Sequence, residues 1–286
     1  MKAIYIDSLK IHDFADGTLK FFVMPTIAGL EYPATRVSSF DRSGQDGQII
    51  SNIFLGERRV TIEGKIYGLD SGTDYVTQRT NLISTLKPQK DANGLPIHRV
   101  LRGTGMDDID YRLLVQVIAL RMPHTNPRSS SFQIDLLGAY PYVEKLTATT
   151  TSVSTYTGGG AVYPVIYPVI MTAGSGGEST ITNNGNGEAY PTITLQGPLT
   201  NPRIENVTLS KWIQLNLSIS SGVTVVVDMF NRTIVQAGVT NRLSSLSADS
   251  QFWWLEAGDN TVRLTSGITG EAGLASVVHR DSYVGI

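Results

Sequence analysis

The stretch Val223-Thr-Val-Val-Val-Asp-Met-Phe-Asn-Arg-Thr-Ile-Val235 carries the clearest structural signal in this chain. Residues 223–227 form an almost unbroken β-branched run, which is typical of a strand covered on both faces. Residues 228–231 have the composition of a tight turn, and the apolar residues after them predict the second strand of a hairpin.

Strand signals of this kind recur at short, even spacing from Pro191 onward, separated by turn residues. They lie at residues 192–195, 212–219, 223–229, 233–237, 251–255, 261–265 and 275–280. Such a series predicts a β-sandwich or jelly roll for the second half of the chain.

The first half also reads as β-structure. Its predicted strands lie at residues 3–9, 19–24, 59–67, 111–119 and 131–137. Pro25 lacks a backbone donor and is expected to end the second of these strands, and Gly64 is expected to mark a bulge in the third.

One segment, residues 74–88, has the pattern of a helix. Tyr75, Leu82 and Leu86 fall on one face, Thr73 or Asp74 can cap the start, and Pro88 ends it. We therefore expect a mainly β protein, in which one helix covers a β-sandwich or split-barrel-like sheet in the N-terminal domain.

The texture of the sequence changes after Tyr142. A Ser and Thr-rich stretch at residues 147–157 leads into Gly158-Gly-Gly160, which is the composition of a domain boundary. We expect domains at residues 1–145 and 146–286. A strand at residues 162–170 and a polar loop at residues 172–187 are assigned to the second domain.

Charge and composition exclude several classes of function. The 286 residues carry a formal net charge of −2 and no cysteine, so tight nonspecific nucleic-acid binding, disulfides and thiolate metal sites are not expected. Neither a secretory signal nor an apolar run of membrane-spanning length is present. We expect a protein that is made and retained in the cytoplasm.

No motif predicts catalysis, a metal or a cofactor. The four histidines, including His124, lie far apart, and the carboxylates of Asp107-Asp-Ile-Asp110 lack the spacing of a calcium loop. His279-Arg-Asp-Ser282 contains the residue types of a catalytic triad, but three near neighbours on one strand end are expected to be polar surface residues.

The aromatic residues Trp212, Trp253 and Trp254 are the strongest binding candidates. Because adjacent side chains of a strand face opposite ways, only one of Trp253 and Trp254 can lie in the core. The exposed tryptophan would serve core or interface packing, or would stack against a sugar ring.

Several motifs, taken together, resemble the distal tail proteins of siphophages over most of the chain. In the first half they are Asp41-Arg-Ser-Gly-Gln-Asp-Gly47, Arg58-Arg-Val-Thr-Ile-Glu-Gly-Lys-Ile-Tyr-Gly68 and the helix ending at Pro88. In the second half they are Asn184-Gly-Asn-Gly-Glu-Ala-Tyr-Pro191, Gly197-Pro-Leu-Thr-Asn-Pro202, Val225-Val-Val-Asp-Met-Phe-Asn-Arg-Thr233, Phe252-Trp-Trp-Leu-Glu-Ala-Gly-Asp-Asn260 and Val278-His-Arg-Asp-Ser-Tyr283.

This resemblance implies a structural protein of the virion tail tip, made in the cytoplasm of a host bacterium. Its first domain would build a sixfold ring with other copies, and its second, a jelly-roll or galectin-like domain, would project outward. The tail tube protein and a tail-tip adsorption protein would be its partners. The polar loop at residues 38–51 is a candidate arm between subunits. The alternative is a carbohydrate-binding module that contacts host wall sugars.

Overall fold

The computed structural model describes residues 1–13, 21–67, 72–123, 128–156 and 177–286. It is mainly β, as predicted, and divides the chain into two compact units. The first contains Met1–Leu146 and Tyr283–Ile286, and the second contains Thr147–Ser282. His124 and the strand predicted at residues 162–170 lie outside the described residues.

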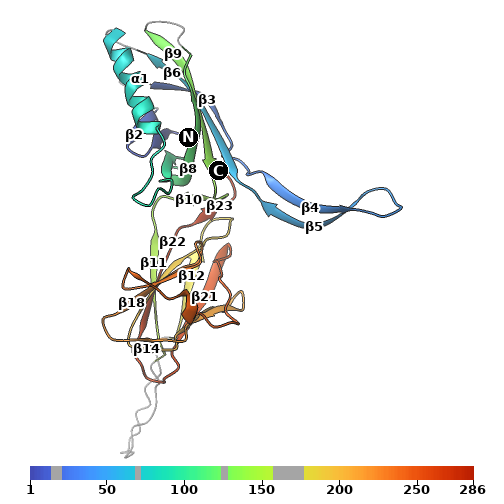
Figure 1. Ribbon diagram of the computed structural model, residues 1–286, viewed down its shortest axis with the longest axis vertical. Helices are drawn as coiled ribbons and strands as arrows, with labels where there is room; N and C mark the ends of the chain where they lie inside the picture. Colours follow the sequence, from blue (N-terminus) through green and yellow to red (C-terminus); the bar gives the residue numbers. More distant parts are fainter. Residues whose placement is uncertain (14–20, 68–71, 124–127, 157–176) are drawn as a thin grey trace, which may run out of the picture. The chain divides into compact units, whose positions relative to one another are not determined.

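A twisted sheet and one helix form the N-terminal unit (Figure 1). Along the sheet the strands follow the order β2 (Leu9–Asp13), β1 (Ala3–Ile6), β7 (Arg99–Thr104), β8 (Asp110–Arg121), β9 (Ser129–Gly138), β6 (Arg58–Tyr67) and β3 (Phe21–Ala28). β10 (Val143–Lys145) pairs with β8, and β23 (Ser282–Tyr283) is where the chain returns to this unit.

The helix α1 (Gly72–Leu86) packs against the sheet as predicted. Tyr75, Leu82 and Leu86 are buried among core residues of β6 such as Ile62 and Ile66. Arg79 lies on the same side and donates hydrogen bonds to the Tyr75 hydroxyl and to the Met122 carbonyl. Within the described residues, no helix is long and apolar enough to span a membrane.

Three details of the first half differ from the sequence-based predictions. Residues 3–9 are not one strand, because the chain turns at Asp7, whose φ is +54°, and pairs β1 with β2. β3 continues through Pro25, which a strand at the sheet edge tolerates because its outer donors need no partner. The register shift lies in β3 between Val23 and Ile27, whereas β6 pairs regularly with β9 through Gly64.

The C-terminal unit is a sandwich of antiparallel sheets. One sheet has the order β11 (Thr149–Ser154), β22 (Leu274–His279), β13 (Thr192–Gln196), β18 (Thr224–Asp228), β19 (Thr233–Gln236) and β20 (Thr240–Asn241). The other has the order β12 (Glu178–Asn183), β21 (Gly258–Thr265), β15 (Arg203–Asn206) and β16 (Lys211–Gln214). The short strands β14 (Leu199–Thr200) and β17 (Ser218–Ile219) pair with each other, and Leu243–Ser245 form a 3₁₀ turn.

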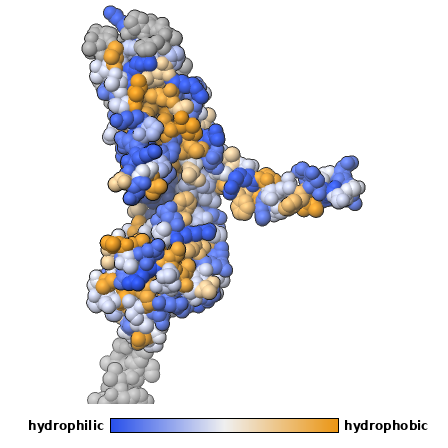
Figure 2. Space-filling model, viewed as in Figure 1, coloured by the Kyte–Doolittle hydropathy of each residue, from blue (hydrophilic) through white to orange (hydrophobic). Residues whose placement is uncertain are grey.

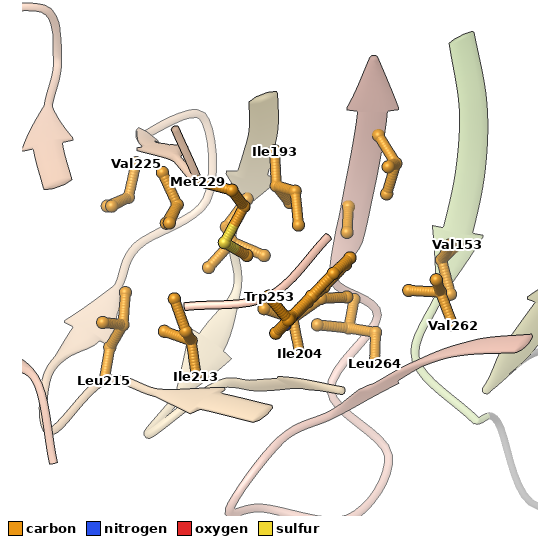
Figure 3. Packing of buried hydrophobic residues seen from close by; sticks show 14 of the residues in the cluster. Val153, Ile193, Ile204, Ile213, Leu215, Val225, Met229, Trp253, Val262 and Leu264 are labelled. Carbon is orange, nitrogen blue, oxygen red and sulfur yellow. The ribbon is translucent and has the colours of Figure 1, made fainter. Parts of the chain in front are cut away.

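The two sheets share one apolar core, part of which is drawn in Figure 3. Ile193 and Val225 come from the first sheet, Ile204 and Val262 from the second, and all four are fully buried. The run that includes β18 is not covered on both faces as predicted. Val225 and Val227 are buried while Val226 between them is half-buried, because only one face of β18 meets the other sheet.

Candidate assembly surface

The segment that was predicted to be a polar loop is a β-hairpin, which we call the arm. It consists of β4 (Thr35–Asp41) and β5 (Gln48–Leu55), which pair with each other and with no strand of the main sheet (Figure 1). The tip closes with a hydrogen bond from the Arg42 amide to the Gly47 carbonyl, and Gly44 and Gly47 supply the positive φ angles of the turn. The loop prediction was therefore wrong.

Large apolar side chains are exposed along the whole arm. The members of this set, each between 52% and 64% exposed, are Val37, Phe40, Ile49, Ile50, Ile53 and Phe54. Figure 2 shows apolar patches along the visible side of the arm. Sequence reasoning missed these residues, although two phenylalanines and three isoleucines within a glycine-containing polar segment were a signal for a contact surface.

The root of the arm is fixed by a buried arginine. Arg58 follows β5 directly and is fully buried. Its Nε donates to the Pro141 carbonyl at 2.7 Å, its Nη1 to the Gly29 carbonyl at 2.9 Å, and its Nη2 to the Val284 carbonyl. Burial lowers the pKa of Arg58, and the charge of Glu31 opposes that effect.

The last residues of the chain pack against the segment that leads into the arm. The Ile286 amide donates to the Leu30 carbonyl at 3.1 Å. A Cβ at Gly285 would lie 1.5 Å from the Glu31 carbonyl oxygen, and a Cβ at Gly29, whose φ is +99°, would lie 1.8 Å from that of Arg59. Both glycines are therefore required for these backbones to approach each other.

In the C-terminal unit, the three tryptophans occupy different environments. Residues 251–254 are extended but form no strand, and only Leu255 makes a bridge, to Ala189, so the strand prediction there was wrong. Trp253 is fully buried at the centre of the core (Figure 3). Trp212 and Trp254 are half-buried.

Cations cover the faces of both half-buried tryptophans. The Arg203 guanidinium carbon lies 4.1 Å from the Trp212 ring centroid, and Lys211 Nζ lies 3.8 Å from that of Trp254. Trp254 also donates from Nε1 to Glu256 at 2.9 Å and lies beside Tyr190. A sugar could stack on the Trp254 face that Lys211 covers only after displacing that ammonium group.

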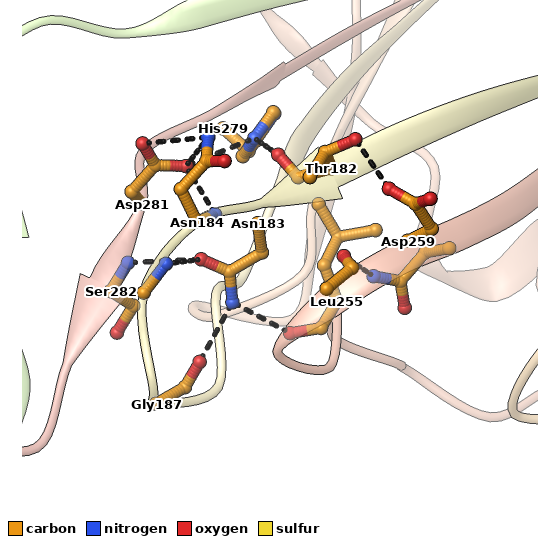
Figure 4. Close-up of polar contacts among 12 residues, drawn as sticks. Thr182, Asn183, Asn184, Gly187, Leu255, Asp259, His279, Asp281 and Ser282 are labelled. Atoms are coloured by element: carbon orange, nitrogen blue, oxygen red, sulfur yellow. Dashed lines mark hydrogen bonds and ion pairs between the residues drawn. The ribbon is translucent and has the colours of Figure 1, made fainter.

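The residues predicted to be a polar surface at 279–282 are instead buried, and that prediction was wrong. His279, Asp281 and Ser282 are at most 2% exposed. Figure 4 shows the network that holds them: Asp281 Oδ1 accepts from the Asn184 amide at 3.0 Å, and Asn183 Oδ1 accepts from the Ser282 amide at 3.2 Å. The segment 279–282 is thus a folded anchor for the turn at residues 184–187.

This burial makes the stability of the C-terminal unit dependent on pH. His279 Nε2 donates to the Thr182 carbonyl at 3.1 Å, and its Nδ1 has no hydrogen-bond partner among the described residues. Burial is the largest effect and lowers the pKa of His279, against the opposing effects of Thr182 and Asp281. Since the folded pKa lies below the unfolded value of about 6.5, this stability is complete above that pH and is lost as pH falls below it.

We expect the unfolding midpoint of the C-terminal unit to fall as pH decreases from about 7.5 to about 5. Tryptophan fluorescence during urea unfolding measures it, with the variant His279→Gln as control because it cannot titrate there. Since carboxylates also titrate, the relevant quantity is the difference between the two proteins. An identical pH dependence in both would contradict the prediction.

Among the described residues, no group of three or more histidine, aspartate or glutamate side chains is arranged to hold a metal ion. The Asp107 carboxylate accepts from the Tyr111 hydroxyl at 2.6 Å and from the Ile109 amide at 3.2 Å. These contacts lower the pKa of Asp107 and fix the turn that begins there, which gives this residue a structural role.

Comparisons with known proteins define the class to which the chain is similar. Residues 184–274 match the family model of the siphovirus-type tail component, C-terminal domain. This match begins at the Asn184 motif and confirms the resemblance found in the sequence. The chain therefore has the C-terminal domain of a phage tail component, a structural part of the virion.

The whole fold is similar to the crystal structure of the Dit (gp 19.1) protein of phage SPP1, whose description calls it a paradigm of the hub adsorption apparatus in phages that infect Gram-positive bacteria. The TM-score is 0.65 at 12% identity, over 98% of each chain. A chain of the phage P2 baseplate, in its activated conformation with Ca, gives a TM-score of 0.47 at 9% identity, over 96% of this chain and 97% of that one. No curated protein matches the sequence.

Proposed function

We propose that this chain is the ring-forming hub at the distal end of a long non-contractile phage tail. Six copies would close a ring that joins the tail tube protein to the adsorption protein of the tail tip. The family match in the C-terminal unit and the fold shared with a hub protein support this proposal. Residues 1–145 would form the ring, and residues 146–286 would be the outward jelly-roll or galectin-like domain.

The arm is the observation that carries this proposal. A closed ring requires a heterologous interface, in which one surface of each subunit contacts a different surface of the next. The arm is built for such a contact, because it is a separate hairpin with six exposed apolar side chains and an anchored root. An isolated monomer would gain nothing from exposing these side chains to water.

The charge of the chain suits the ring's lumen. A tail hub must let DNA pass without binding it, and a formal net charge of −2 provides no basic excess to hold phosphates. The protein would be made in the cytoplasm of the host bacterium and would act at the tail tip of the virion.

The solution mass tests this function. Light scattering of the purified chain is expected to give six times 31.0 kDa, about 186 kDa, and negative-stain images are expected to show a central hole. Purified tail tube protein should be included in a second run, since it can serve as a template. A 31.0 kDa monomer at all concentrations in both runs would refute the ring.

The alternative function is the binding of host wall sugars by the C-terminal unit. Tyr190, Phe230 and Trp254 form the aromatic cluster that could serve it, and Phe230 is 49% exposed. Binding to wall polysaccharide should then be lost on Trp254→Ala and retained on Trp212→Ala. Equal binding by both variants, or none by the parent protein, would eliminate this alternative.

A further inference from the structure

The two faces of the arm are equally apolar. Directly opposed residues of a hairpin share a face, and successive residues of one strand alternate between faces. Val37 pairs with Ile53 and the neighbouring Ser39 pairs with Ile50, so these three apolar side chains lie on one face, here called face A.

The opposite face, face B, carries three more. Phe40 pairs with Ile49, and Arg36 pairs with Phe54, and both pairs alternate with those of face A along β4. All six apolar side chains are more than half exposed. A ribbon that packed on one body would bury one face and present a polar face to water, as half-buried strands ordinarily do. This arm has no polar face.

The nature of the chain excludes two kinds of cover. The arm contains two basic residues, Arg36 and Arg42, and two acidic ones, Asp41 and Asp46, so it has no charge excess for nucleic acid or an anionic membrane. A lone two-stranded ribbon also leaves both outer edges with unpaired backbone groups, which a lipid interior does not tolerate. The cover must therefore be protein.

We infer that both faces of the arm are buried in the ring and that two different copies of this chain cover them. This inference rests on the proposed ring function. A charge-neutral ribbon can meet identical chains without repulsion, and the N-terminal unit offers matching surface. Its exposed apolar side chains are Val76 and Ile83 on α1, Leu95 and Ile97 before β7, and Met106 after it.

At least one of these surfaces is held rigidly, as a docking surface should be. The Asp91 carboxylate accepts from the Asn93 amide at 2.9 Å and the Leu95 amide at 2.8 Å, while the Asp91 amide donates to the Leu95 carbonyl. This turn therefore keeps Leu95 at 61% exposure without any contact of its side chain with the core requiring it. An arm held between two such surfaces links three subunits instead of two.

Two double variants test the faces separately. Val37→Ser with Ile53→Ser removes an opposed pair from face A, and Phe40→Ser with Ile49→Ser removes one from face B. Each is expected to raise the concentration at which rings form by about tenfold or more. The matched control is Ser38→Ala with Asn52→Ala, an opposed polar pair, which should leave the ring unchanged.

The outcomes separate this inference from the proposed function. A parent protein that never forms rings refutes both. Parent rings that tolerate the loss of either pair refute the inference and leave the ring function standing.

Photo-crosslinking resolves the case in which serine substitutions unfold the arm. Because the chain contains no cysteine, Val37→Cys and Phe40→Cys each provide one labelling position for a thiol-linked photo-crosslinker. In purified rings, both labels are expected to give adducts with other copies of the chain, at different segments. Adducts from one face only, or adducts from the second face that require another tail protein, would overturn the inference.

Discussion

The variant Trp253→Ala is expected to destabilise the C-terminal unit by about 3–5 kcal/mol, the usual cost of removing a buried tryptophan. Trp253 is fully exposed to the core and not to water, and it touches a cluster drawn from both sheets, including Ile193 and Leu264 (Figure 3). Alanine would leave a cavity at the place where the two sheets meet, and close-packed sheets relax only partly around such a void.

Tryptophan fluorescence measures this effect without interference from the N-terminal unit. All three tryptophans, at positions 212, 253 and 254, lie between Thr147 and Ser282, so two probes remain in the variant. Urea unfolding should show a lower midpoint for the fluorescence transition.

Two controls separate packing from other causes. Trp254→Ala removes a half-buried ring, so it should cost much less. Trp253→Phe keeps most of the packing and removes an indole N–H that has no acceptor among the described residues, so its loss should also be small. Equal losses in Trp253→Ala and Trp254→Ala would show that Trp253 is not the central packing residue.

Local pattern was sufficient to predict most of the sandwich. The hairpin of β18 and β19 was predicted from β-branched residues around a turn, and the Asp228 carboxylate indeed accepts from the Asn231 amide at 2.8 Å. The helix was predicted from Tyr75, Leu82 and Leu86, since a single apolar face has one local explanation. These features depend on residues close together in the chain.

The arm could not be predicted by the same reasoning, because its information lies in an assembly. A strand signal assumes that one face is buried in its own chain, whereas Phe40 and Val37 lie on opposite faces and neither is buried in the subunit. Polar residues and glycines at the tip then favoured a loop.

Burial of His279 and Asp281 was missed for a different physical reason. Polar residues are ordinarily exposed unless they are paired, and their partners Thr182 and Asn184 are almost a hundred positions away in the sequence. The motif at residues 184–191 is therefore a structural counterpart of the motif at residues 278–283. Sequence reasoning quoted both as parts of a family resemblance without relating them.

The variant Arg58→Met is expected to destabilise the N-terminal unit by about 3–5 kcal/mol, because it removes a buried cation that donates to three carbonyls. Methionine has a similar length and is apolar, so the change isolates the hydrogen bonds from the volume. Gly29, Pro141 and Val284 come from three separate segments, and Arg58 is the donor that all three share. Hydrogen exchange should locate the loss at the Ile286 amide, which donates to Leu30.

The adjacent arginine provides the matched control. Arg59 is paired with Glu57 at the surface, and its side chain is 72% exposed, so Arg59→Met should change stability by no more than about 1 kcal/mol. If the two variants unfold at the same urea concentration by circular dichroism, the anchor role of Arg58 is wrong. If Arg58→Met alone is destabilised and its rings also weaken, the contacts at the root hold the arm in the geometry that assembly uses, because the carbonyls of Gly29 and Val284 have then lost their common donor.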